Sequence, residues 1–194
     1  MIGVIFGPPG SGKGTQAARM EQAFKLEHLS TGAILRDEVA RGTAVGREVV
    51  RVMAAGDLVP DHLIEKMVKD RLAGAGNASG VLLDGFPRTL EQARALDALL
   101  AGDGRSVDFV VSLEAPERVL VDRILHRASV EGRTDDTREA IAERMREYHK
   151  LTAAVLDHYR ESGVPVAAVD GVGGVEEVFD RIRAAVPIPP ERQG

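Results

Sequence analysis

Short uninterrupted apolar runs alternate along the chain with longer segments in which apolar residues recur at helical spacing. The apolar runs predict buried strands at 3–6, 81–84, 109–113 and 166–170, with a weaker fifth candidate at His28-Leu29. The helical spacing predicts helices at about 13–25, 31–41, 44–55, 61–73, 90–101, 116–127, 137–162 and 174–186. Because strands separated by helices are joined by parallel crossovers, we expect an α/β fold: a doubly wound, parallel five-stranded sheet flanked by helices.

The composition is ordinary for a globular chain. The 194 residues are 44% hydrophobic and 28% charged, which predicts one compact domain with small appended segments. No apolar run approaches the roughly 20 residues that a membrane span needs, and the first residues lack a basic segment and a cleavage site. We therefore expect a cytoplasmic protein with no membrane partner. The absence of cysteine excludes disulfides and thiolate metal sites.

The charge balance adds one unusual feature, because 20 of the 25 basic residues are Arg although the net charge is −5. An acidic chain is not expected to bind nucleic acid. The Arg guanidinium, however, presents a planar set of donors that suits phosphate. Codon bias explains an Arg excess equally well, so only the positions of these residues can choose between the two explanations.

A glycine-rich loop follows the first predicted strand and opens the first helix: Gly7-Pro8-Pro9-Gly10-Ser11-Gly12-Lys13-Gly14-Thr15. Glycines let backbone N–H groups turn inward around phosphate oxygens, the helix N-terminus adds positive potential, and Lys13 can reach the terminal phosphates. The loop departs from the general phosphate-loop (P-loop) pattern, because Gly14 replaces the hydroxyl that binds Mg²⁺ and Thr15 comes one residue later. The predicted ATP-binding residues here are Gly10, Ser11, Gly12, Lys13, Gly14 and Thr15.

This form of the loop resembles that of the adenylate kinase family, nucleoside-monophosphate kinases that transfer a phosphoryl group from ATP to AMP. Two further segments are similar to signatures of the family, Ser30–Arg36 and Gly56–Asp61. The resemblance implies that AMP is bound by Thr31, Arg36, Asp57, Leu58 and Val59. Ser30 and Asp61 also fit as helix N-caps, which explains their local sequences equally well but leaves Arg36 unexplained.

The strongest second match is Leu83-Asp84-Gly85-Phe86-Pro87-Arg88-Thr89. A strand that ends in Asp places a carboxylate at the carboxyl edge of the sheet, where open α/β folds bind ligands. The resemblance implies that Asp84 serves Mg²⁺ through water and that AMP is bound by Gly85, Phe86, Pro87, Arg88 and Gln92, with Arg88 on its phosphate. Thr89 to Gln92 also fits a capping box, and the two roles of Gln92 are equally weighted.

Four Arg residues around a predicted helix–loop–helix match the family's clamp on the donor phosphates: Arg123, Arg127, Arg133 and Arg144. Arg123 and Arg127 are four residues apart and so share one helix face. The resemblance implies that ATP is bound by Arg123 and Arg127, and AMP also by Arg133 and Arg144. The catalytic residues that it implies are Lys13, Arg88, Arg123, Arg133 and Arg144.

The region after Arg127 is short. Only residues 128–132 separate it from Arg133, so we expect a short lid without the inserted domain, or the zinc site, of some family members. The resemblance implies that Asp135 and Asp136 support this lid. It also implies that Val172, after the last strand, lies at the ATP adenine, although a plain strand-to-helix turn explains that sequence equally well.

The resemblance extends from Gly7 to about Val172 and implies a division of the chain. The expected core is 1–29, 60–125 and 133–194, the expected segment that binds the nucleoside monophosphate (NMP) is 30–59, and the expected short lid loop is 126–132. The implied activity is the reversible, Mg²⁺-dependent reaction ATP + AMP = 2 ADP, in purine nucleotide homeostasis. We expect a monomer that takes Mg²⁺ as Mg-ATP.

Two alternatives remain open at this point. A kinase for UMP or CMP would share the short lid, although Thr31 and Gln92 resemble the pattern of the AMP-specific enzymes. A nucleotide-binding switch module would use the same phosphate loop. Such a module would not need the second phosphate-binding pair, Arg36 and Arg88.

Overall fold

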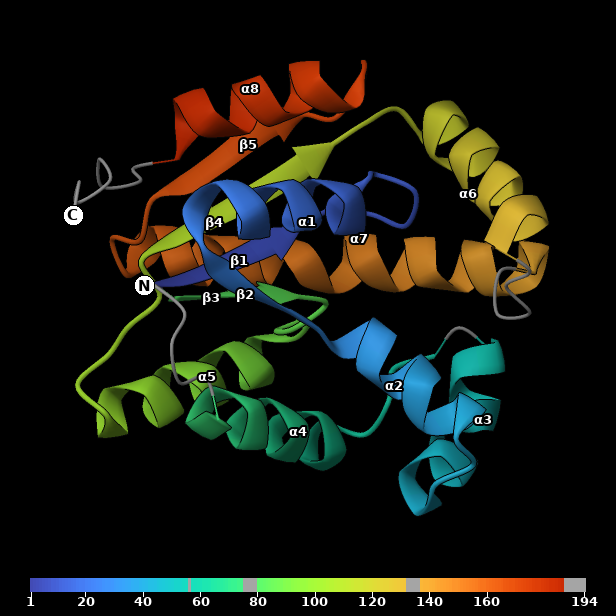
Figure 1. The fold of residues 1–194 in the computed structure, drawn as a ribbon, viewed down its shortest axis with the longest axis horizontal. Helices are drawn as coiled ribbons and strands as arrows, with labels where there is room; N and C mark the ends of the chain where they lie inside the picture. The colour runs from blue at the N-terminus through green and yellow to red at the C-terminus, as the bar shows by residue number, and fades with distance from the viewer. Residues whose placement is uncertain (56, 75–79, 132–136, 187–194) are drawn as a thin grey trace.

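The computed structural model describes residues 1–55, 57–74, 80–131 and 137–186 (Figure 1). Its five strands form one parallel sheet in the order β2-β3-β1-β4-β5. They are β1 (Ile2–Phe6), β2 (Leu26–Ser30), β3 (Gly80–Asp84), β4 (Phe109–Glu114) and β5 (Val166–Asp170). The helices are α1 (Lys13–Phe24), α2 (Thr31–Ala40), α3 (Ala44–Ala55), α4 (Asp61–Gly74), α5 (Leu90–Gly102), α6 (Glu117–Glu131), α7 (Arg138–Glu161) and α8 (Val175–Ala185). No helix in these ranges is long and apolar enough to cross a membrane.

The predicted fold class is confirmed, and each face of the sheet is covered by its own helices (Figure 1). Ile5 and Val111 point to one face and pack with residues of α1 and α8. Val4 and Leu83 point to the other face and pack with residues of α4, α5 and α7. Because both faces are buried, the central strands are continuous apolar runs, which made them easy to predict. The weaker candidate at His28-Leu29 is also a strand, β2.

One predicted boundary is wrong. Helix α6 was expected to end near residue 127 and a lid loop to occupy 126–132, but the helix continues to Glu131. The physical reason is that the sequence from His126 to Glu131 contains neither Gly nor Pro, so nothing in it terminates a helix before Gly132. Residue 132 lies outside the described ranges.

The carboxyl ends of β1 and β3 are neighbours in the middle of the sheet. Ile5 pairs with Asp84, and Ser30 at the end of β2 is in register with the same Asp84. The chain leaving β1 continues into α1 on one face, whereas the chain leaving β3 continues into α5 on the other. A crevice between two such strands is the place where open α/β sheets bind ligands. The fold therefore brings together the phosphate loop and the motif that begins at Asp84.

Helices α2 and α3 form a small unit at the lower right of Figure 1, beyond the sheet. They pack closely at Gly46, where an added Cβ atom would overlap the carbonyl oxygen of Glu38. Thr43, between the helices, donates from Oγ1 to the Glu38 carboxylate and accepts from the Gly46 N–H. This contact sets how α3 crosses α2.

We predict that Gly46→Ala lowers the free energy of unfolding by about 1–3 kcal/mol, because the added methyl group meets backbone atoms that cannot rotate away. Urea unfolding of the purified variant measures this. Gly102→Ala is the matched control, since that glycine is also helical but has no atom within 4 Å of an added Cβ. Equal stability of the two variants would contradict the predicted close packing.

Candidate active site

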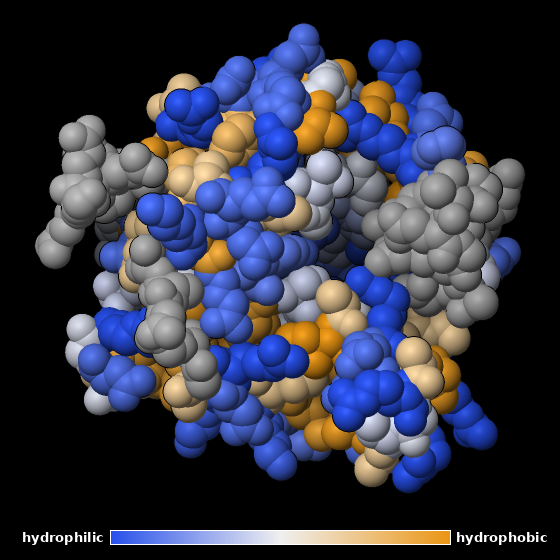
Figure 2. Space-filling view, viewed as in Figure 1, coloured by the Kyte–Doolittle hydropathy of each residue, from blue (hydrophilic) through white to orange (hydrophobic). Residues whose placement is uncertain are grey.

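A cavity of about 1120 Å³ opens at the carboxyl edge of the sheet. Its wall is formed by the loop after β1, the start of α2, the turn after β3, one face each of α6 and α7, and the loop after β5. Figure 2 shows a hollow in this face of the molecule, bordered mainly by hydrophilic and near-neutral residues. Segments from the whole length of the chain thus share one site.

The loop after β1 presents the start of α1 to this cavity. Gly12 is the N-cap of α1 with a φ of 89°, a conformation that favours glycine, and no side chain of the described residues caps this helix start. Lys13 donates from Nζ to the carbonyl oxygen of Gly7 at 2.7 Å, which holds its ammonium group over the loop. A helix N-terminus without a side-chain cap and a Lys side chain together make a site for an anion.

Asp84 ends β3 in the middle of the cavity and is only 7% exposed. Its Oδ2 atom lies 3.3 Å from Nε2 of His28 on the neighbouring strand β2. Burial alone raises the pKa of Asp84, but the hydrogen bond with His28 and the charges of Lys13 and Arg88 outweigh it, so the pKa is lowered. Asp84 is therefore a buried anion among cations.

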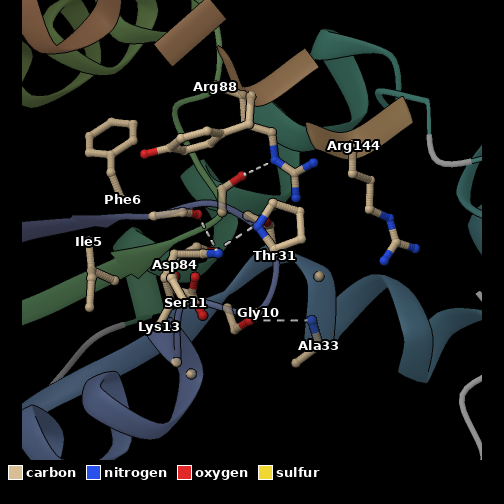
Figure 3. Close-up of a pocket in the computed structure, with 18 of the residues that line it drawn as sticks. Ile5, Phe6, Gly10, Ser11, Lys13, Thr31, Ala33, Asp84, Arg88 and Arg144 are labelled. Carbon is tan, nitrogen blue, oxygen red and sulfur yellow. Dashed lines mark hydrogen bonds between the residues drawn. The ribbon is translucent and has the colours of Figure 1, made fainter. Parts of the chain in front are cut away.

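Two guanidinium groups project into the cavity opposite the phosphate loop, those of Arg88 and Arg144 (Figure 3). Arg88 donates from Nε to the carbonyl oxygen of Gly85 at 2.9 Å, within the turn that follows β3. Desolvation of the guanidinium lowers the pKa of Arg88, and the like charge of Arg144 lowers it further. The negative charge of Asp84 raises this pKa but does not outweigh the other two effects. Two neighbouring Arg side chains that repel each other form a second place for an anion.

Gln92 has both ends of its side-chain amide engaged and is 2% exposed. Its Oε1 accepts from the Arg88 backbone N–H at 2.7 Å, and its Nε2 donates to Asp61 Oδ1 at 2.6 Å. In a capping box, Gln92 would accept from the backbone N–H of the N-cap residue Thr89. Here it accepts instead from the N–H of the preceding residue, Arg88. Gln92 also belongs to the cavity wall, so an AMP contact through its remaining N–H stays a prediction.

Most of the predicted site residues lie in the cavity wall. They are Gly10, Ser11, Gly12, Lys13, Gly14, Thr15, Thr31, Arg36, Asp57, Leu58, Val59, Asp84, Gly85, Pro87, Arg88, Gln92, Arg123 and Arg144. Arg127 lies one helical turn beyond Arg123 on α6. The predicted residues Arg133, Asp135 and Asp136 lie outside the described part of the chain.

Among the predicted residues whose side chains the structure describes, Phe86 and Val172 are not part of the wall. Phe86 is 2% exposed and packs in the apolar core beneath the site, because its large ring is buried between the sheet and the helices there. Val172 is partly exposed, and its carbonyl oxygen accepts a hydrogen bond from Arg181 on α8. Their neighbours Gly85, Pro87, Gly171 and Gly173 line the cavity instead.

Sequence patterns alone do not point to several ionisable residues of the wall, among them His28, His126 and Tyr148. Burial raises the pKa of the Tyr148 phenol, and a hydrogen bond with Ser112 opposes this rise. The spacing along the chain would have indicated two of these residues, Tyr148 and His28. Tyr148 is four residues after Arg144 on a helix and shares a face with that predicted site residue. His28 is two residues before Ser30 on a strand and shares a face with the first residue of the Ser30–Arg36 signature.

We predict that the Asp84 carboxylate stabilises the fold above the ordinary pKa of Asp and loses this effect as the pH falls through its lowered pKa. In metal-free buffer, the difference in free energy of unfolding between the unmodified chain and Asp84→Asn should shrink from about pH 5 to about pH 3. Denaturant unfolding at several pH values tests this, with the exposed Asp70→Asn as control. A difference that stays constant or grows would contradict a lowered pKa.

The chain is similar along most of its length to known adenylate kinases. The family model of Adenylate kinase matches residues 5–164. The adenylate kinases of Xylella fastidiosa strain M23 and Xanthomonas campestris pv. campestris strain 8004 are each 48% identical over 183 residues, which cover 94% of this chain and 97% of the relative. That of Stenotrophomonas maltophilia strain K279a is 46% identical with the same coverage. This chain therefore belongs to the adenylate kinase family.

Proposed function

We propose that this chain catalyses the reversible transfer of the γ-phosphoryl group of Mg-ATP to AMP, which gives two ADP. The observation that carries the proposal is that two separate anion sites, the phosphate loop and the Arg88–Arg144 pair, face each other in one cavity. The cavity of about 1120 Å³ is at the large end of ligand pockets, which typically have volumes of about 300–1,000 Å³. A switch module would need only one of these anion sites.

The donor half is built on the phosphate loop. We assign the ATP phosphates to Gly10, Ser11, Gly12, Lys13, Gly14 and Thr15, with Arg123 and Arg127 on α6 closing from the other side. Mg²⁺ enters as part of the substrate Mg-ATP. Asp84 fits it, because Mg²⁺ prefers oxygen ligands, keeps several waters, and is usually held by one or two carboxylates together with substrate phosphates. In the described part of the chain, no three His, Asp or Glu side chains form a protein-only metal cage.

The acceptor half lies between α2, α3 and the turn after β3. We assign the AMP phosphate to Arg36, Arg88 and Arg144, with Arg133 added from outside the described ranges. Thr31, Gly85, Pro87 and Gln92 would surround the nucleoside with the backbone of residues 57–59. Phe86 supports this half from the core rather than by contact.

The chemistry requires positioning and charge neutralisation more than covalent help. The acceptor phosphate is already an anionic nucleophile, so no side chain needs to remove a proton from it. Two polyanions repel each other, and we propose that this repulsion is offset by Lys13, Arg88, Arg123, Arg133 and Arg144. Cations fixed before the reaction stabilise the charge that spreads over the transferred phosphoryl oxygens.

Water competes with AMP as the acceptor, so the site must close before transfer. We propose that residues 30–59 close over AMP and residues 126–132 over ATP, with Asp135 and Asp136 supporting the second movement. The rest of the chain then forms the core. We further propose a monomer that acts in the cytoplasm in purine nucleotide homeostasis, without nucleic acid or membrane partners.

We predict that AMP is phosphorylated faster than any other monophosphate. Turnover should be compared with AMP, UMP, CMP, dTMP and GMP as acceptors and Mg-ATP as donor. Turnover of UMP or CMP well above that of AMP would identify a pyrimidine kinase. No turnover of any acceptor, with weak binding of diadenosine pentaphosphate, would favour the switch module.

We predict that Arg88→Ala lowers kcat/KM for AMP on the order of 100-fold, as removal of one charge-stabilising donor typically does. The protein should stay folded by circular dichroism, because the Arg88 side chain faces the cavity. Arg94→Ala is the control, since that Arg is exposed on α5 and is not part of the cavity wall. Near-normal turnover of the Arg88 variant would refute the acceptor assignment.

A further inference from the structure

The loop that joins β5 to α8 is held at its carbonyl groups by side chains from three different helices. Arg181 on α8 donates from one nitrogen to the carbonyl oxygens of Asp170 and Val172, at 2.8 and 2.6 Å. Arg123 on α6 donates to that of Gly171 at 3.0 Å. Gln16 on α1 donates to that of Val175 at 3.0 Å.

Two N–H groups of the loop are bonded as well, because Gly171 donates to the carbonyl oxygen of Glu114 at 2.7 Å and Gly174 donates to Oε2 of Glu177 at 2.8 Å. Three of its residues are glycine, and they line the cavity with backbone atoms: Gly171, Gly173 and Gly174. Glycine loses more conformational freedom on ordering than any other residue, so a loop of this composition needs external contacts to keep one conformation. A ligand group at this end of the cavity would meet backbone N–H and C=O groups, whose positions are set by whatever holds the loop.

Arg181 differs from the other two side chains. Arg123 and Gln16 belong to the cavity wall, so both can also respond directly to a ligand. Arg181 is not part of the wall and lies on α8, which Figure 1 shows packed along β5. It reaches the loop from outside the cavity, through the backbone carbonyl groups of Asp170 and Val172 and the Asp170 carboxylate.

The two bonds of Arg181 close the turn in which the loop leaves the strand. They link carbonyl groups two residues apart through one charged donor, and hydrogen bonds of a charged group are stronger than neutral ones. The Asp170 carboxylate adds to this turn, because its Oδ1 accepts from the Val172 N–H at 2.9 Å and its Oδ2 lies 3.7 Å from Arg181. The carbonyl oxygen of Val172 thereby points to Arg181, and Gly171, Gly173 and Gly174 face the cavity.

We propose that Arg181 is a positioning residue for the nucleobase of the phosphoryl donor. It fixes the backbone of residues 170–174 so that their polar groups fit the base, and it touches neither nucleotide. This inference rests on the proposed function, since the donor half of the cavity is the half that contains the phosphate loop and this loop.

The test compares steady-state kinetics of Arg181→Met and Arg181→Lys with the unmodified chain. Loss of a charged hydrogen-bond donor should raise KM for Mg-ATP about fivefold in Arg181→Met. The KM for AMP and kcat should stay within about twofold, because the acceptor half and the reacting atoms are untouched. Arg181→Lys, which keeps a charged donor, should recover most of the affinity for ATP.

Arg183→Met is the matched control. Arg183 lies on the same helix, is 60% exposed and pairs with Asp180 on the surface, at 3.6 Å. It should leave both KM values unchanged. An unchanged KM for ATP in Arg181→Met, an equal rise in both KM values, or an equal effect of Arg183→Met would overturn the proposal.

Equilibrium titration with ATP alone separates this proposal from the proposed function. Weaker ATP binding by folded Arg181→Met supports the role of Arg181 even if the unmodified chain phosphorylates no AMP, a result that would refute only the function. Equal ATP binding by Arg181→Met and the unmodified chain would refute the role of Arg181 alone. If Arg181→Met does not fold, the comparison of Arg181→Lys with Arg183→Met decides, with a smaller but selective rise in KM for ATP expected.

Discussion

One buried carboxylate, that of Asp84, makes the arrangement of positive charge around the cavity possible. Lys13 comes from the loop after β1, His28 from β2, and Arg88 from the turn after β3, and each interacts with Asp84. Without a central anion, the positive charges of Lys13 and Arg88 would repel each other across a narrow crevice between parallel strands. In the low effective dielectric of such a crevice, the interactions are stronger than they would be at the surface. In the proposed function, Lys13 and Arg88 are held in this way for the substrate phosphates.

The backbone around Asp84 is equally constrained. Gly85 has a φ of 84°, and a Cβ atom there would lie 2.7 Å from Oγ1 of Thr31. Thr31 Oγ1 in turn donates to the carbonyl oxygen of Asp84. The turn that presents Arg88 and the helix start that carries Thr31 are therefore packed against each other at a position that only glycine can occupy. This packing ties the geometry of the acceptor half to the strand that carries the central anion.

The prediction from sequence succeeded where a local pattern has a single physical meaning. The central strands are apolar because both faces of the sheet are covered, and the glycine-rich loop has few uses other than holding an anion between a strand and a helix. It was weaker at β2, an edge strand in which only Leu26 and Leu29 are buried. It was wrong at the end of α6, where the helical spacing predicted an end near residue 127 and the resemblance implied a loop, although the local sequence still favours a helix.

The sequence by itself determined the succession of strands and helices along the chain, the position of the phosphate loop, and the charged residues near that loop. Only the tertiary structure decided which partner each side chain contacts. Gln92 forms hydrogen bonds with both Arg88 and Asp61, and Phe86 packs in the core. Arg181 donates a hydrogen bond to the carbonyl oxygen of Val172. The physical reason is the range of the interactions. Backbone conformation and the periodicity of burial are set by residues within a few positions, and they can be read along the chain. A hydrogen bond between residues far apart in sequence depends on which surfaces the folded chain brings together, and no local pattern records that.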